Sequence, residues 1–218
     1  MIVIATNNGA NVLPALIASL HETGHTPSEF LIVDTGTTEA TAREYLALLA
    51  TQGYCVTRTP YKGYDTGAWL WAYREFPADE YLFLHDSILV DTPEIVNVFR
   101  RQWQHGVGAV AFAGFPMFFD NNAQMEFLAD CFDMDRVKAA ERGIFGNLFY
   151  TRHAVLQEME AQGFLPSIPN DKNECCALER GWATAFRSCG FGVVELLDNY
   201  RDVETSGVGV RKVYQHRL

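Results

Sequence analysis

The sequence contains few positive charges, and none of them lies near its start. It has 17 Lys and Arg residues against 27 Asp and Glu residues, a net charge of −10, and no Lys or Arg precedes Arg43. A general binder of nucleic acid or of anionic membranes needs an electropositive surface, so we expect neither partner. The uncharged start also argues against a signal peptide, whose first residues are basic. The longest uncharged apolar stretch, residues 106–119, contains Pro116 and is too short for a membrane span.

Several catalytic signatures are missing as well. The segment after the first apolar run, Thr6-Asn7-Asn8-Gly9, lacks the G-x-G-x-x-G pattern of dinucleotide-binding enzymes. Neither the P-loop pattern G-x-x-x-x-G-K-[ST] nor the hydrolase pattern G-x-S-x-G occurs. A sugar nucleotidyltransferase typically opens with a Gly-rich, basic loop, which this sequence does not have. Its five cysteines show no C-x-x-C spacing, so we expect a reduced, cytoplasmic protein without a zinc site.

What the first half does contain is an alternation of short apolar runs and segments with helical spacing. The runs are rich in β-branched and aromatic residues, which favours buried strands. We expect strands at residues 2–6, 30–34, 54–57 and 81–84, with helices between them. Asp65 is a candidate N-cap for the helix that carries Trp69 and Tyr73. The pattern predicts an α/β fold of the Rossmann-like type, a mainly parallel sheet with helices on both faces.

The second half is less regular and predicts mixed strands. Strands are expected at residues 109–113, 148–150 and 190–196, and helices at residues 152–162 and 173–189. We see no internal repeat and no linker rich in Gly, Ser or Pro. The sequence therefore predicts a single domain, residues 1–218, with a first half at 1–105 and a second half at 106–218 that ends in a basic tail.

Polar side chains follow three of the expected strands. They form the clusters Thr6-Asn7-Asn8, Asp34-Thr35-Gly36 and His85-Asp86-Ser87. In an open parallel sheet the ligand site lies beyond the carboxyl ends of the strands. An Asp at a strand end can accept hydrogen bonds from a base or a ribose, and a following Gly lets a backbone approach closely. Each cluster by itself is equally compatible with an ordinary polar loop.

Five segments, taken in order, resemble the family-two-like glycosyltransferases of the GT-A fold. They correspond to the nucleotide-binding strand end, the donor-binding segment, the metal-binding Asp-x-Asp motif, the segment before the acceptor-side helix and the Glu-Asp motif of that helix. In this chain the segments are residues 32–39, 64–68, 81–87, 146–152 and 173–178. Two positions depart from the family pattern, because Asp-x-Asp reads His-Asp-Ser and the Asp of Glu-Asp is Cys175.

The resemblance implies a GT-A fold and a glycosyltransferase that uses a nucleotide-diphosphate-sugar, UDP- or GDP-linked. It implies an inverting transfer to a hydroxyl of a glycan, a lipid-linked glycan or a protein, as in polysaccharide biosynthesis. The donor contacts would come from Asp34, Asp65 and Gly67 in the matching segments, and from Thr6 and Asn8 in the polar cluster after the first strand.

A divalent cation, Mn²⁺ or Mg²⁺, is the expected cofactor. Held by carboxylates and phosphates, it stabilises the charge that develops on a leaving diphosphate. Asp86 is the carboxylate that remains at the metal motif, and His216 is a second candidate because some GT-A enzymes use a C-terminal His as a ligand. Arg211 and Lys212 can close over the diphosphate, or the tail is only a solvated end. For His85 a structural hydrogen bond at the strand terminus is favoured over metal ligation.

Glu174 is the candidate general base. An inverting transfer needs one carboxylate within hydrogen-bond reach of the acceptor hydroxyl, and a position in the first turn of a helix favours the ionised form. Glu174 can equally be an acid that merely suits a helix start, as can Asp171. The altered metal motif leaves an alternative function open: a non-catalytic relic of the fold that binds a nucleotide or a glycan.

Overall fold

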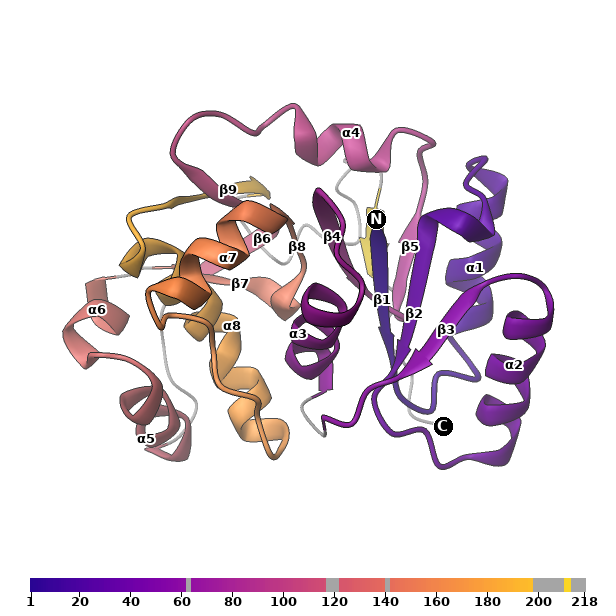
Figure 1. The fold of residues 1–218 in the computed structure, drawn as a ribbon, viewed down its shortest axis with the longest axis horizontal. Coiled ribbons are helices and arrows are strands. Elements are labelled where there is room, and N and C mark those ends of the chain that lie inside the picture. Colours follow the sequence, from indigo (N-terminus) through magenta and orange to yellow (C-terminus); the bar gives the residue numbers. More distant parts are fainter. Residues whose placement is uncertain (62–63, 117–121, 140–141, 198–209, 213–218) are drawn as a thin grey trace.

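A mixed sheet of eight strands runs through the molecule (Figure 1). The computed structural model describes residues 1–61, 64–116, 122–139, 142–197 and 210–212. The strands of this sheet are β1 (Ile2–Thr6), β2 (Phe30–Asp34), β3 (Cys55–Arg58), β4 (Glu80–His85), β6 (Val107–Pro116), β7 (Arg142–Ile144), β8 (Phe149–Arg152) and β9 (Gly192–Leu197). Their order is β3-β2-β1-β4-β8-β6-β7, and β9 pairs with β6.

The first half of the sheet is parallel and the second half is mixed. β1 lies between β2 and β4 and is parallel to both, and β3 extends the parallel part beyond β2. β8 runs antiparallel to β4 and β6, whereas β9 runs parallel to β6. β1 and β2 are buried along their whole length, as expected of central parallel strands, which need apolar residues on both faces. The predicted mainly parallel sheet with mixed strands in the second half is confirmed.

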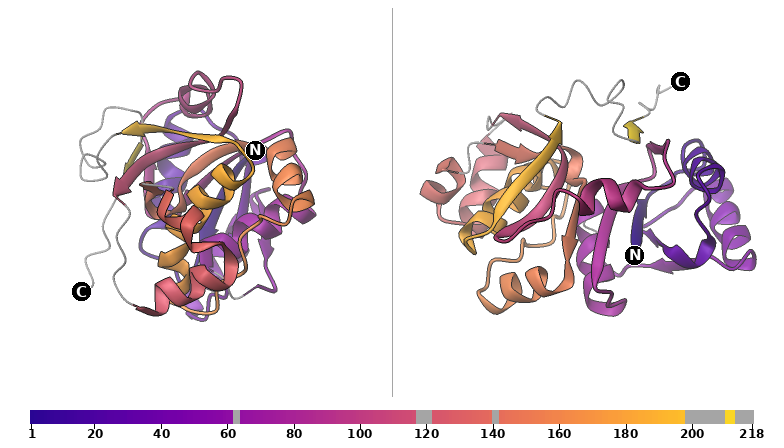
Figure 2. Two further views of the ribbon diagram at one scale, coloured as in Figure 1. Left: turned by 90° about the vertical axis from the view of Figure 1, so that its left-hand side faces the viewer. Right: turned by 90° about the horizontal axis from the view of Figure 1, so that it is seen from above.

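Helices cover both faces of the sheet, and Figure 2 shows the arrangement from two further directions. The α-helices are α1 (Leu13–Glu22), α2 (Ala40–Thr51), α3 (Tyr64–Glu75), α4 (Ile95–Arg100), α5 (Asn122–Cys131), α6 (Met134–Ala139), α7 (His153–Ala161) and α8 (Lys172–Ser188). One core lies between the sheet and α1, α2 and α4, and the other lies between the sheet and α3 and α5 to α8. Side chains alternate along a strand, so Ile4 and Leu84 enter the first core while Val3 and Phe83 enter the second.

Two short strands form a separate antiparallel ladder. β5 (Ile88–Val90) follows β4 after a tight turn, and β10 (Val210–Lys212) pairs with it, Lys212 opposite Ile88. The main chain of the basic tail therefore returns to the segment that follows the third polar cluster. No helix within the described residues has the length and apolar character needed to cross a bilayer.

Candidate active site

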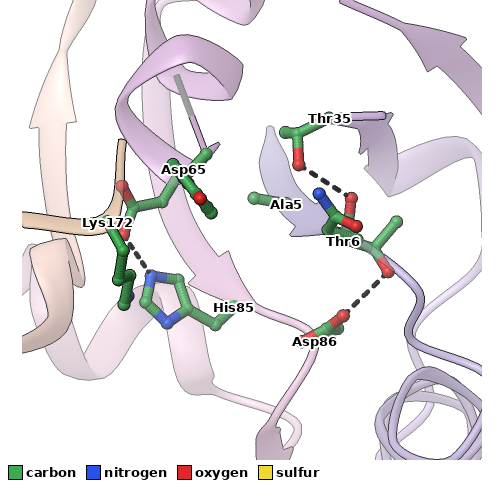
Figure 3. A pocket seen from close by; sticks show the side chains of 9 residues that line it. Ala5, Thr6, Thr35, Asp65, His85, Asp86 and Lys172 are labelled. Carbon is green, nitrogen blue, oxygen red and sulfur yellow. Dashed lines mark hydrogen bonds and ion pairs between the residues drawn. The ribbon is translucent and has the colours of Figure 1, made fainter. Parts of the chain in front are cut away.

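A polar pocket opens at the carboxyl ends of β1, β2 and β4 (Figure 3). This is the point where the chain crosses from one side of β1 to the other, the usual place for a ligand in an open α/β sheet. The pocket has a volume of about 140 Å³, below the roughly 300–1,000 Å³ of sites that enclose a drug-sized molecule. It is lined by Ala5, Thr6, Asn7, Thr35, Tyr64, Asp65, His85, Asp86 and Lys172.

The alternation of side chains along β1 and β4 gives the pocket two sides. Thr6 continues the face of β1 that packs on α1, and it lies beside Asp86, which follows the end of β4. His85 continues the opposite face of β4 and lies beside Asp65 at the start of α3. Figure 3 shows these two pairs on either side of Ala5. The first and third polar clusters of the sequence therefore meet in one pocket, as predicted for neighbouring strand ends.

Asp86 is a largely buried carboxylate with one hydrogen bond from a neighbouring strand. The Thr6 hydroxyl donates to Asp86 Oδ2 over 2.8 Å. Burial raises the pKa of the Asp86 carboxyl, and the bond from Thr6 only partly opposes this effect. A cation bound in the pocket would favour the charged form, so Asp86 is suited to hold one.

Gly9 gives this pair the space it needs. A Cβ at Gly9 would lie 2.5 Å from both Asp86 Oδ2 and Thr6 Oγ1, closer than atoms can approach. A residue without a side chain is therefore required for the Thr6–Asp86 pair to form.

Asp65 holds the other side of the pocket together. Its Oδ2 accepts from His85 Nε2 at 2.9 Å and Asn147 Nδ2 at 3.2 Å, and its Oδ1 accepts from the Cys175 thiol at 3.1 Å and the Thr66 amide at 2.6 Å. Burial opposes ionisation, but the hydrogen bond and charge of His85 and the bonds from Cys175 and Asn147 outweigh it, so the pKa of Asp65 is lowered. All four acceptor positions of the carboxylate are thus used within the protein. Asp65 was expected to cap α3 but lies inside its first turn, because the helix begins at Tyr64.

His85 is fixed in orientation by two contacts. Its ring stacks on Trp69 with a centroid distance of 6.1 Å and an interplanar angle of 19°, and Trp69 Nε1 donates to the Asn147 carbonyl over 3.2 Å. The hydrogen bond to Asp65 is the structural one expected at this strand terminus. It uses only one of the two ring nitrogens.

Lys172 brings a positive charge to the pocket. It is the first residue of α8, and its ammonium lies 5.7 Å from the centroid of the Tyr64 ring. Burial disfavours the charged form, but nearby acidic groups, including the Asp65 carboxylate, outweigh it and raise the pKa of Lys172. Lys172 was not among the residues expected at the site. A cation in the first turn of a helix opposes the helix dipole, and that local conflict was a usable signal.

Asp34 lies near the pocket without lining it. Its Oδ1 accepts from the amides of Gly36 at 3.0 Å and Thr37 at 2.7 Å, and its Oδ2 lies 3.8 Å from Arg58 Nε. It borders a second hollow of about 250 Å³ between α2 and β3, which is lined by Asp34, Arg43, Leu46, Ala47, Ala50, Val56, Thr57 and Arg58. The part of Asp34 in binding a base or ribose stays a prediction.

Asn8 and Gly67 also lie outside the pocket lining. The Asn8 side-chain oxygen accepts from the amides of Thr38 at 2.9 Å and Glu39 at 3.0 Å, which ties the first loop to the start of α2. Gly67 lies within α3, where a Cβ would approach Tyr61 Cβ at 3.2 Å. Both residues shape the elements around the pocket, and direct contact with a donor stays a prediction for each.

Glu174 belongs to the cap of α8. Its carboxylate accepts from the Asn170 amide at 2.6 Å and the Asn170 side chain at 3.1 Å, while its own amide donates to Asp171 Oδ1 over 3.0 Å. It does not line the pocket. Cys175, the residue that follows it, contacts the buried Asp65 carboxylate through its thiol. The catalytic role of Glu174 stays a prediction.

The basic tail is described only in part. β10 places the main chain of Arg211 opposite Leu89 and that of Lys212 opposite Ile88, close in sequence to Asp86. The predicted metal ligand His216 lies outside the described residues. Among the residues that are described, no three His, Cys, Asp or Glu side chains gather as a metal site. The donor set fits a cation held by one or two protein ligands and completed by phosphate and water, as is usual for Mg²⁺ in phosphate sites.

No protein-family model and no curated protein matches the sequence. Solved structures do match. A mannosyltransferase from Pyrobaculum calidifontis, in complex with GDP-Man and Mn²⁺, superposes with a TM-score of 0.56 at 15% identity over 89% of this chain. Glucosyl-3-phosphoglycerate synthase from Mycobacterium tuberculosis has a TM-score of 0.56 at 13% identity over 100% of this chain and 72% of its own.

The chain has the GT-A fold. A second structure of the synthase, in complex with Mg²⁺ and UDP, gives a TM-score of 0.53 at 14% identity, covering 90% of this chain and 68% of the other. The chain spans 53% of the mannosyltransferase. The fold expected from the five segments is confirmed. At sequence identities this low, the similarity to the solved structures shows the fold alone.

Proposed function

We propose that this GT-A chain is a glycosyltransferase that moves a sugar of the hexose class from a UDP- or GDP-linked donor to an acceptor hydroxyl. The observation that carries the proposal is the pocket at the switch point of the sheet, which is lined by both Asp86 and Lys172. To bind a diphosphate, the site needs positive charge and a protein group that can hold a metal cation. The complexes of GT-A neighbours with GDP-Man and Mn²⁺, and with Mg²⁺ and UDP, support the same chemistry.

The pocket is suited to the diphosphate end of the donor. Asp86 would hold Mn²⁺ or Mg²⁺, and the cation, when bound, would stabilise negative charge on the leaving diphosphate. Lys172 would contact the phosphates from the opposite side of the pocket. His216 as a further ligand, and Arg211 and Lys212 as residues that cover the diphosphate, complete the proposal for the tail.

The nucleoside would extend beyond this small pocket toward β2. Asp34 borders the neighbouring hollow, and Arg58 lies beside it. A base or ribose placed there would meet a carboxylate whose Oδ2 is not used by the turn amides. Thr6 and Asn8 would shape the path between the two sites, and Asp65 and Gly67 would hold the donor-binding segment.

For the acceptor side we propose an inverting transfer with Glu174 as base. Its carboxylate would have to exchange its bonds with Asn170 for a bond to the acceptor hydroxyl. The acceptor would be a glycan, a lipid-linked glycan or a protein, as in polysaccharide biosynthesis in the cytoplasm. The donor half would be residues 1–105 and the acceptor half residues 106–218.

One observation favours the alternative of a non-catalytic relic. Glu174 is engaged in the cap of α8, and the residue that follows it is a thiol bonded to Asp65 rather than a carboxylate. Such a chain would bind a nucleotide or a glycan without transferring a sugar.

The test is a panel of UDP- and GDP-sugars incubated with the protein and Mn²⁺, with free nucleotide as the readout. The enzyme hypothesis predicts release of UDP or GDP from at least one donor, by slow hydrolysis if no acceptor is present. Glu174→Gln should abolish transfer while donor binding is retained, whereas Glu158→Gln on α7 should leave both unchanged. Nucleotide binding without release from any donor would favour the relic, and full turnover by Glu174→Gln would remove Glu174 as the base.

A further inference from the structure

Three consecutive residues at the start of α3 each contact α8. The contacting pairs are Tyr64–Lys172, with the ammonium 5.7 Å from the ring centroid, Asp65–Cys175, with the thiol 3.1 Å from Oδ1, and Thr66–Trp182, with the indole Nε1 3.0 Å from the hydroxyl oxygen. We call these three pairs the α3–α8 joint. Tyr64, Asp65 and Lys172 also line the donor pocket, so the joint determines where part of the pocket wall lies.

The joint holds its residues in a defined arrangement. Tyr64 has a φ of 47°, in the left-handed region that residues with a side chain rarely adopt. Such a conformation persists only where the surrounding structure fixes it. Cys175, Thr66 and Trp182 are buried, so water does not compete for the hydrogen bonds that they make.

Asp65 connects Cys175 with Lys172. The two residues are three positions apart in α8 and therefore lie on one face of the helix. Burial raises the pKa of the Cys175 thiol, so the thiol keeps its proton and donates it to Asp65. The Asp65 carboxylate is also among the acidic groups that raise the pKa of Lys172, so it attracts the ammonium. One carboxylate thus acts on both residues of this face.

The first turn of α8 needs such a contact to keep Lys172 in place. Lys172 is the first residue of the helix, where a positive charge opposes the helix dipole and where helices tend to fray. The bond from the Glu174 amide to Asp171 caps the helix, but it lies within the turn. The bond from the Cys175 thiol ties the turn to α3 and to the pocket.

We propose that Cys175 is a positioning residue for Lys172: through Asp65, its thiol holds the first turn of α8 against α3 and keeps the ammonium at the phosphates of the donor. The inference rests on the proposed function, because it needs a nucleoside diphosphate in this pocket. It gives a role to the thiol that stands where the resembled Glu-Asp motif has its second carboxylate. A carboxylate at that position would place a second negative charge against Asp65.

The test is a double-mutant cycle, read by calorimetric titration of the full chain with UDP and with GDP in Mn²⁺. Cys175→Ala should lower the affinity about tenfold in the unmutated background, because the ammonium is no longer held at its place. In the Lys172→Met background the same change should lower it by less than about twofold, because the group that Cys175 positions is gone.

Two further variants separate the hydrogen bond from the packing of the side chain. Cys175→Ser keeps a donor and should bind nucleotide within about threefold of the unmutated protein. Cys189→Ala removes a thiol at the other end of the same helix and should leave the affinity unchanged. If Cys175→Ala does not fold, Cys175→Val, which removes the donor but keeps the volume, takes its place in the cycle.

The results distinguish this inference from the proposed function. Equal losses from Cys175→Ala in both backgrounds would show a purely structural role, and would overturn the inference even if the variant also has a lower Tm. No loss in the unmutated background, or a loss from Cys175→Ser as large as that from Cys175→Ala, would overturn it as well. No loss from Lys172→Met removes the phosphate contact and this inference with it, whereas absence of nucleotide binding by the unmutated protein contradicts the proposed function itself.

Discussion

At the scale of single residues, the pocket brings together charged groups of both signs whose pKa values differ from the usual ones. Asp86 has its pKa raised by burial, and Lys172 has its pKa raised by nearby acidic groups that include the Asp65 carboxylate. Charged groups with shifted pKa values gather at functional sites more often than elsewhere. Opposite charges on one small pocket suit a ligand that itself combines a cation with phosphates.

Lys172→Met tests the positive side of the pocket. The substitution keeps much of the side-chain length but removes the charge, so affinity for UDP or GDP should fall by about 10- to 100-fold, as expected for a charged hydrogen bond worth about 1.5–3 kcal/mol. The loss should be smaller for the monophosphates. Calorimetric titration measures it, and Lys138→Met on the exposed side of α6 is the matched control. Equal losses in the two variants, or none in Lys172→Met, would exclude a phosphate contact.

Gly9→Ala tests the close packing beneath Asp86. The added methyl would meet Asp86 Oδ2 and Thr6 Oγ1 at 2.5 Å, so one of the two side chains must move. We expect the affinity for nucleotide in the presence of Mn²⁺ to fall by on the order of tenfold, since a ligand must be held within about 0.5 Å of its productive position. Gly192→Ala is the control, because its Cβ would meet only the Gly106 carbonyl, at 3.7 Å. Unchanged binding by Gly9→Ala would show that the Thr6–Asp86 pair does not set the position of the ligand.

At the scale of secondary-structure elements, the opposite end of β4 is tied to α4 and β8 by one carboxylate. Glu80 accepts from Arg100 Nε at 3.2 Å and also from the Tyr150 hydroxyl. The bond from Arg100 lowers the pKa of Glu80 in spite of its burial, and the bond from Tyr150 adds to the effect. The elements that carry His85 and Asp86 are thus anchored at the edge of the sheet that faces away from the pocket.

Glu80→Gln should reveal this anchor through the pH dependence of stability. A carboxyl whose pKa is lowered by folding binds fewer protons in the native state, so its contribution is complete at neutral pH and is lost as the pH falls below the usual 4.5 toward the lowered value. At pH 7 the variant should be about 1–2 kcal/mol less stable than the unmutated protein, which corresponds to a fall in Tm of roughly 2–8 °C. This difference in stability should disappear as the pH is lowered. Thermal melts from pH 7 to 3.5 measure it. Glu94→Gln removes a charge from the exposed ion pair with Arg101, and its Tm should differ little from that of the unmutated protein at any pH. A difference in Tm that stays the same at all pH values for Glu80→Gln would contradict the role of the ionised Glu80 carboxylate as an anchor.

The elements that the sequence predicts well are those with a strong local pattern. β1 and β2 have the predicted bounds because each is a continuous apolar, β-branched run. α5 was missed because Gln124 and Leu128 are its buried residues and no apolar stripe results. β5 and β10 have three residues each, too few for a period to show.

The same distinction applies to the site. Thr6 and Asp86 could be predicted because the carboxyl ends of neighbouring parallel strands must meet. The contacts of Asp65 could not, because they join it to Cys175, 110 residues away, and to Asn147, 82 residues away, through α8 and the loop before β8. No local spacing records such contacts, and they depend on how the second half of the chain packs against the first.

At the scale of the whole molecule, the GT-A fold explains where the pocket lies, and the net charge explains what the pocket must contain. A chain with a net charge of −10 repels a nucleoside diphosphate unless positive charge is concentrated at the site. Lys172 supplies part of it, and β10 returns the main chain of Arg211 and Lys212 to the same end of the molecule. A divalent cation would supply the rest.

The most direct test of the central claim is a calorimetric titration of the full chain with UDP and with GDP, in Mn²⁺ and in excess chelator. The account predicts one saturable site for at least one nucleotide in Mn²⁺, with affinity reduced at least about tenfold by the chelator. Asp86→Asn should reduce it similarly, whereas Asp91→Asn, a few residues beyond the pocket, should not. Binding that is the same with and without Mn²⁺, or absent for both nucleotides, would contradict the account.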